Sequence, residues 1–202
     1  MRAANQLLEE AGWIIGDDGL RRNAEGQVLT LEILDDSPSF ERIALPFIEN
    51  LRLIGIDASW NMIDSAQYEQ RQEDFDYDMV IGRFSMGLSP SVELNTLFSS
   101  ESADAPGTYN LTGLKDPVVD DLINQIIAAE DRVTMEIRVK ALDRVLRDKK
   151  IWVPNWFKGS HWVAYWDVFG KPDQKPPYDR GIDNWWFEQD KYDALVAQGA
   201  LR

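Results

Sequence analysis

The hydrophobic pattern of the first 84 residues switches repeatedly between the two-residue period of a strand and the longer period of a helix. Three short runs, alternating or apolar at the centre, predict strands at residues 29–33, 56–62 and 77–84. Two segments at helical spacing separate them, at residues 38–54 and 65–72. This order favours parallel strands with helices packed on the sheet. We therefore expect an α/β fold built on a mainly parallel βαβαβ unit.

Local signals refine the bounds of these elements. Ser37 is a candidate N-cap with Pro38 at the first helical position, while Pro46 predicts a kink or a late start in the same helix. Upstream, a helical stripe ends at Gly12, a plausible C-terminal stop. Its members are Ala4, Leu7, Leu8 and Ala11.

Two longer helices follow, and the composition changes after them. Asp116 and Pro117 predict the start of a helix whose apolar stripe runs to Ile127, and a second helix is expected at residues 133–148. Residues 151–169 read as a Trp-rich strand, residues 170–181 as a Pro-rich loop or linker, and residues 182–198 contain a terminal helix. We place a domain boundary near residue 150, giving segments 1–150 and 151–202.

Composition excludes several classes of function. The chain has 202 residues with 35 acidic and 21 basic side chains, a net charge of −14 that repels phosphate backbones, so nucleic acid is not an expected partner. It contains no Cys, which excludes disulfides and thiolate chemistry. No run approaches the roughly 20 apolar residues of a membrane span, and no signal-peptide core follows Met1.

No residue pattern marks a catalytic or metal site. Asp74, Asp76 and Asp78 alternate like the start of a calcium loop, but Met79 stands where that loop needs Gly and Ser85 where it needs Glu. The single histidine, at position 161, has no partner arrangement typical of nucleophilic catalysis. A paired-carboxylate site is defined only in space, and nothing marks one. We expect no enzyme activity, no cofactor and no metal.

The many tryptophans of the C-terminal part leave more than one function open. They could stack on sugars, as in a carbohydrate-binding module or a fragment of a carbohydrate-active enzyme, or they could pack against other protein surface in a structural interaction domain. Flat, adjacent, exposed indoles would favour sugar. The residues concerned are Trp152, Trp156, Trp162, Trp166, Trp185 and Trp186.

One long connection is expected to carry function. Residues 85–112, about 28 positions, separate the third strand from the next helix, and loops beyond about 12–15 residues are usually functional or disordered. The loop begins at a strand's carboxyl end, where open α/β sheets place ligands.

Three motifs in order resemble one known family. The run FDYDMVIGRFSMGLSPSVE starts at Phe75, a second motif follows it, and the run ALDRVL precedes Pro154. The second motif consists of Asn110, Gly113, Asp116, Pro117 and Asp120. This series resembles the extracellular solute-binding proteins of peptide-type ABC importers, family 5, and looks most like the subgroup that handles oligopeptides and peptide-like antibiotics.

The resemblance implies a fold and a function. Members have two lobes that close on an extended peptide and deliver it to a membrane permease. They are periplasmic monomers and catalyse no reaction. Residues 1–150 would form most of one α/β lobe, and residues 151–202 would return to the other. Because the family's export signal lies far upstream of these motifs, we expect the chain to be one lobe of a longer precursor.

The candidate cleft residues lie in and beside the long loop. Many peptide-binding relatives carry an acid there that pairs with the ligand's α-amine, but it would fall near Met86 or Gly87, and neither can pair with an ammonium. The ligand could thus be blocked, longer, or not a peptide. Arg83 and Glu93 are expected to supply charge, and Phe84 and Met86 apolar contact, although Arg83 and Phe84 could merely end the strand. The full candidate set is Arg83, Phe84, Ser85, Met86, Ser89, Glu93 and Asn110.

Overall fold

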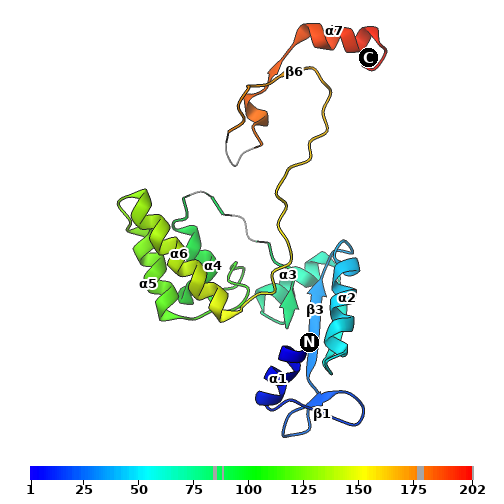
Figure 1. The fold of residues 1–202 in the computed structure, drawn as a ribbon, viewed down its shortest axis with the longest axis vertical. Helices are drawn as coiled ribbons and strands as arrows, with labels where there is room; N and C mark the ends of the chain where they lie inside the picture. Colours follow the sequence, from blue (N-terminus) through cyan, green and yellow to red (C-terminus); the bar gives the residue numbers. More distant parts are fainter. Residues whose placement is uncertain (84–85, 88, 177–179, 202) are drawn as a thin grey trace. The chain divides into compact units, whose positions relative to one another are not determined.

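The computed structural model describes residues 1–83, 86–87, 89–176 and 180–201 (Figure 1). The chain divides into two compact units, Met1–Trp152 and Val153–Arg202. No helix in the described part is both long and apolar enough to cross a bilayer.

A three-stranded parallel sheet organises the first unit. The central strand β3 (Thr30–Asp35) pairs in parallel with β4 (Asp57–Met62) on one side and with β5 (Met79–Val80) on the other. Helix α2 (Glu41–Arg52) connects β3 to β4, and α3 (Ser65–Glu73) connects β4 to β5. The predicted βαβαβ unit with parallel pairing is confirmed.

The two connecting helices reach opposite faces of the sheet. On one face, Ala44 and Ile48 of α2 pack with Ile33 and Ala58 in a core of buried side chains. On the other face, Arg71 of α3 reaches Glu32 with an N–O distance of 2.7 Å. Because β4 and β5 flank β3 on opposite sides, right-handed crossovers place successive helices on opposite faces. Full burial of a side chain such as Ile48, at 2% exposure, stabilises the fold by about 1.5–3 kcal/mol.

Two details of the unit differ from the sequence prediction. Within the described residues the third strand spans Met79–Val80, whereas residues 77–84 were predicted, and the last of these, Phe84, lies outside the described part. Helix α2 begins at Glu41 and contains Pro46, so its start is not set by that proline, and Ser37 does not cap it. The Oδ1 atom of Asp35 instead accepts the Ser37 amide, at an N–O distance of 3.3 Å, and residues 38–40 form a turn before the helix.

Arg21 ties the N-terminal segment to the sheet. This segment comprises α1 (Arg2–Glu10) and a short antiparallel pair, β1 (Ile14–Ile15) with β2 (Arg21–Arg22). The Arg21 side chain is 1% exposed and donates three hydrogen bonds of 2.6 Å. Its acceptors are the Ile54 carbonyl, the Trp13 carbonyl and Oδ1 of Asn5.

A helical group completes the first unit. It consists of α4 (Glu93–Phe98), the 3-10 turn η1 (Ser100–Ser102), α5 (Pro117–Ile127) and α6 (Arg132–Lys149). Asp116 accepts the Val118 amide at 2.8 Å, which confirms the predicted N-cap. The connection predicted as a loop over residues 85–112 contains a helix at 93–98 and a 3-10 turn at 100–102. Leu94 and Phe98, one helical turn apart, bury themselves against α5 and α6, so α4 forms where no long apolar stripe was visible.

The second unit contains a hairpin and a helix. Strand β6 (Phe169–Gly170) pairs with β7 (Trp186–Phe187) in antiparallel orientation, with η2 (Ile182–Asn184) between them and α7 (Gln189–Ala197) after them. The strand predicted at residues 151–169 was wrong over most of its length. No strand occurs at 151–168, because within the described residues no neighbouring strand supplies partners for its backbone groups.

We expect Arg21→Lys to lower the free energy of unfolding by about 2–3 kcal/mol, because one ammonium cannot reproduce the three-way guanidinium geometry and leaves buried acceptors unpaired. Urea titration followed by circular dichroism measures this loss. Arg22→Lys is the matched control and should leave stability unchanged, since the Arg22 side chain pairs with exposed Asp18. Equal effects of the two substitutions would contradict the structural role of Arg21.

We also expect backbone amides of residues 155–165 to exchange with deuterium much faster than those of Met79 and Val80. The latter lie in the parallel sheet, whereas the former have no backbone hydrogen bond to any described residue. Exchange mass spectrometry measures the difference. Equal protection of both segments would place the tail in the core of the first unit and overturn a boundary near residue 150.

Candidate ligand-binding site

Parallel pairing places the carboxyl ends of β3, β4 and β5 along one edge of the sheet. Ligands of open α/β sheets bind outside such an edge. The segments leaving it run from Asp36 to Phe40, from Ile63 to Asp64, and from Ile81 toward α4. These connections are therefore the first place to look for ligand contacts.

Arg83, one of the predicted cleft residues, follows β5 at this edge. Its guanidinium carbon is 5.8 Å from the centre of the Phe40 ring, a cation–π contact between the loop after β5 and the turn before α2. Met86 and Ser89 are exposed on the same loop. Phe84 and Ser85, also predicted, lie outside the described residues.

Ser89 lies at a second surface feature, next to the helical group. It lines a hollow of about 260 Å³ together with residues 129–132 and Met135, at the turn from α5 into α6. The loop after β5 thus links the sheet edge to the start of α6. Glu93 begins α4, where a carboxylate favours the positive end of the helix dipole.

Asn110 has a structural role and is not available to a ligand. It is 1% exposed, and its Nδ2 donates to the carbonyls of Ser99 and Leu114, both at 3.0 Å. Its Oδ1 accepts the Leu114 amide at 3.1 Å. Because the buried amide is committed on both ends, the prediction that Asn110 contacts ligand is not supported, and the residue instead shapes the connection from η1 to α5.

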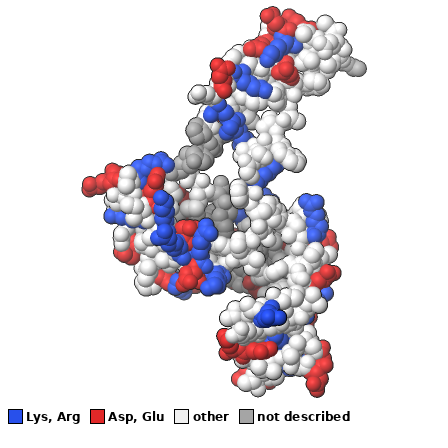
Figure 2. Space-filling view, viewed as in Figure 1, with Lys and Arg blue, Asp and Glu red and all other residues white. Residues whose placement is uncertain are grey.

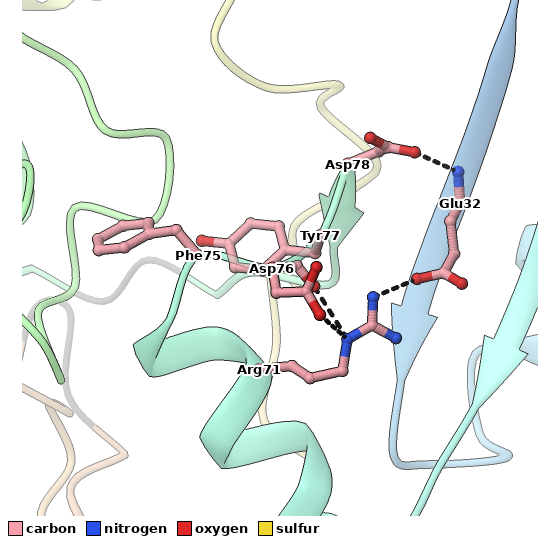
Figure 3. Close-up of a pocket in the computed structure, with 6 residues that line it drawn as sticks. All are labelled: Glu32, Arg71, Phe75, Asp76, Tyr77 and Asp78. Carbon is pink, nitrogen blue, oxygen red and sulfur yellow. Dashed lines mark hydrogen bonds and ion pairs between the residues drawn. The ribbon is translucent and has the colours of Figure 1, made fainter.

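A polar hollow on the α3 face was missed by the sequence prediction. It has a volume of about 410 Å³ and is lined by Glu32, Arg71, Phe75, Asp76, Tyr77 and Asp78 (Figure 3). Figure 3 shows Arg71 pointing between Glu32 and Asp76, with N–O distances of 2.7 and 2.9 Å. The Asp78 carboxylate accepts the Glu32 amide at 2.8 Å. Hydrogen bonding to Glu32 raises the pKa of Arg71 above its ordinary value.

These contacts tie α3 and the start of β5 to the sheet rather than forming a reactive site. Glu32 also accepts a hydrogen bond from Asn61 of β4 at 2.8 Å, so one carboxylate joins three elements. The only sequence signal for this network was the run Asp74, Asp76, Asp78, which carried no information about Arg71. Among the residues that the structure describes, no group of His, Cys, Asp or Glu is placed to hold a metal ion.

Asp35 and Asp36 form a second acidic group, at the carboxyl end of β3 itself. Asp35 is 4% exposed, and its Oδ1 accepts the Asp36 amide at 2.9 Å. The Asp36 carboxylate accepts the hydroxyl of Ser65, the first residue of α3, at 2.7 Å. Burial, followed by the charges of Asp35 and Asp36, raises the pKa of Tyr68 to about 12. Two adjacent acids ending an alternating strand were visible in the sequence, although Ser65 and Tyr68 were not.

Exposed aromatic side chains characterise residues 153–202. Trp162 is 87% exposed, and the Lys158 ammonium lies 4.5 Å from the centre of its ring. Trp185 packs against Tyr165 with ring centres 4.7 Å apart and the planes at 65°. Trp185 thus meets Tyr165 at an angle and does not stack flat on it.

Comparisons with known proteins agree with this architecture. The family model of bacterial extracellular solute-binding proteins, family 5, middle part, matches residues 1–105. A probable peptide-binding protein YejA from Agrobacterium fabrum is 36% identical over 92% of this chain and 30% of its own length. A peptidoglycan-binding protein YepA from the same organism is 34% identical over 92% of this chain and 30% of its own length.

A solved structure shows the same fold. The oligopeptide-binding protein AppA from Bacillus subtilis, in complex with a nonapeptide, superposes with a TM-score of 0.66 at 19% identity. The match covers 74% of this chain and 30% of AppA. The chain thus spans about 30% of the length of the relatives it matches. Since the family model covers 105 of the 202 residues and includes the whole parallel sheet, the chain belongs to the bacterial extracellular solute-binding proteins of family 5.

Proposed function

We propose that the complete protein is the substrate-binding component of an ABC import system, which captures extended peptides or peptide-like solutes and delivers them to a membrane permease. The observation that carries this proposal is the family match over the β4-β3-β5 sheet, the part of the chain whose carboxyl edge forms the candidate site. The relatives named for binding a peptide or peptidoglycan point to the same class of ligand, because both present short peptide chains.

The site's construction suits binding rather than chemistry. Extended peptides are held mainly by main-chain hydrogen bonds, with wet side-chain pockets that tolerate different sequences. The loop after β5 would supply one wall of such a cleft, with Arg83 and Glu93 for charge and Phe84 and Met86 for apolar contact. Ser85 and Ser89 would add hydroxyl groups. The relatives are named for binding and not for catalysis, in keeping with a protein that is not an enzyme.

The second unit would serve the other lobe of the complete protein. Its aromatic surface includes Phe157 at 89% and Trp162 at 87% exposure, more apolar area than a soluble domain usually leaves open. Covering by the remainder of a two-lobed protein would bury it. A sugar-binding function is not favoured, because the Lys158 ammonium lies against the Trp162 ring and Tyr165 packs on Trp185.

Family membership also supports a location of the complete protein outside the cytoplasm. The family consists of extracellular solute-binding proteins. We propose the periplasm as the compartment and a monomer as the working form, with the permease as the membrane partner.

The function is tested on the complete protein purified from its natural host. We expect native mass spectrometry to show co-purified masses of short peptides or peptide-containing wall fragments, because a closed two-lobed site releases its ligand slowly. Sequencing these ligands by tandem fragmentation identifies them. A plain oligosaccharide in the site would contradict the proposal.

We expect the 202-residue chain alone to bind peptides weakly or not at all. A two-lobed site buries its ligand between contacts from both lobes. A single lobe leaves the ligand exposed to solvent, so fewer contacts are available to offset the entropy lost on association. Titration calorimetry with a mixed peptide pool measures this, with the complete protein as the positive control. Micromolar affinity of the chain alone would contradict a cleft shared between two lobes.

A further inference from the structure

The outer face of α6 presents a continuous exposed stripe. Side chains three or four positions apart lie on the same side of a helix, so Val133, Ile137, Lys140 and Arg144 follow one line along α6. All four are exposed, Val133 at 69% and Ile137 at 63%. Leu142, on the opposite side of the helix, is buried in the core of the helical group. These four exposed residues, the α6 stripe, extend over about 16 Å of the helix axis.

Two cations of the stripe are not used within the lobe. Helix α6 carries six basic and three acidic side chains. Two of the basic side chains bond to α5 or its cap, and two pair with an acid one helical turn away; these four are Arg138, Lys149, Arg132 and Arg147. Lys140 and Arg144 form no ion pair with any residue that the structure describes. Their charges are thus available to a partner.

The stripe is a local positive surface on an acidic chain. The whole chain has a net charge of −14, whereas the side chains of α6 sum to +3. Figure 2 shows Lys and Arg gathered over the α4–α6 helical group. Charges separated by more than about 8–10 Å are largely screened at physiological salt, so a partner in contact with α6 meets mainly the local positive charge.

The two apolar side chains of the stripe have no role in the fold that accounts for them. Val and Ile form helices less readily than Lys or Glu, so the stability of α6 does not favour them at exposed positions. Single exposed apolar residues are normal on a protein surface. Val133 and Ile137, however, lie one turn apart and continue directly into Lys140 and Arg144. An apolar patch bordered by charged side chains is the usual composition of a protein–protein interface.

We propose that the α6 stripe is the surface by which this lobe docks on the permease, and that the permease meets it with acidic side chains beside an apolar patch. The inference rests on the proposed function and names the contact surface of its partner. Carboxylates of the permease pair with Lys140 and Arg144, and apolar side chains of the permease pack on Val133 and Ile137.

The charge balance favours a protein partner over a lipid surface. An anionic membrane presents a broad negative field, which repels the 35 acidic side chains of this chain while it attracts the stripe. A protein can place its acidic groups opposite the stripe alone. The small size of the stripe suits a transient contact, because permanent complexes bury larger surfaces. Transient docking is what delivery requires, since the binding protein leaves the permease after it has released its ligand.

Photo-crosslinking in the natural host identifies the partner. A photoreactive amino acid replaces Ile137 in the complete protein, or Glu69 on the exposed side of α3 as the control position. We expect the probe at position 137 to crosslink to a permease subunit of an ABC importer, and the probe at position 69 not to do so. Crosslinks from position 137 to another part of the same chain, to a second copy or to a protein of another class would overturn the proposal, as would the absence of any crosslink.

Biolayer interferometry then measures docking between the complete protein, as purified from its host, and that permease in nanodiscs of zwitterionic lipid. Lys140→Glu and Arg144→Glu should each slow association at least about threefold, because charges at the edge of an interface act mainly on the association rate. Raising the salt concentration from about 0.05 to 0.5 M should slow association of the wild type and hardly affect the double variant. Ile137→Ser should instead speed dissociation, as expected for a lost contact. Arg2→Glu, the matched control on the exposed side of α1, should change neither rate.

Further measurements separate docking from ligand capture. Each variant should keep the melting temperature of the wild type and co-purify with the same peptides in native mass spectrometry, because the stripe is not part of the proposed cleft. Unchanged docking by both charge variants would overturn the α6 surface and leave peptide binding intact. Binding of the wild type to phosphatidylglycerol vesicles, lost in both charge variants, would assign the stripe to lipid and overturn the protein partner. A wild type that captures no peptide would overturn the proposed function and the docking surface together.

Discussion

Parallel pairing on both sides of β3 is the constraint on which the first unit depends. Strands that run in the same direction require a crossover between them, and right-handed crossovers to opposite neighbours place α2 and α3 on opposite faces. The central strand is thereby covered on both sides, with Ile33 and Leu34 at 3% and 0% exposure. The same constraint brings three carboxyl ends together, so the order that builds the core also builds the edge of the candidate site.

Charged side chains take two different roles around this sheet. Arg21 and Arg71 direct their donors to carbonyls and carboxylates of this chain and hold elements together. Asp35 and Asp36 lack a charged partner in the described part, although one of them is buried. Asp35 and Asp36 instead accept hydrogen bonds from the loop after β3 and from Ser65 at the start of α3.

The second unit begins with a long segment that pairs with no strand among the described residues. Residues 155–165 are aromatic and extended, yet they find no neighbouring strand among the described residues. Only where the chain turns back on itself, at β6 and β7, does a short ladder form. A chain that matches about 30% of the length of its relatives is consistent with a unit whose aromatic surface is completed by other parts of the protein.

The sequence alone determined those features that depend on local periodicity and capping. Alternation at 29–33 and 56–62, separated by helical spacing, specified the βαβαβ order, and Asp116 with Pro117 marked the start of α5. Three ordered motifs also identified the family. Tertiary structure decided what depends on contacts distant in sequence. It shortened the third strand to two residues, formed α4 by burying Leu94 and Phe98 against α5 and α6, and committed Asn110 to the carbonyls of Ser99 and Leu114. The buried states of Arg21 and Asp35 were equally hidden, because a residue's charge is written in the sequence but its solvent exposure and its hydrogen-bond partners are set only when separate segments pack together.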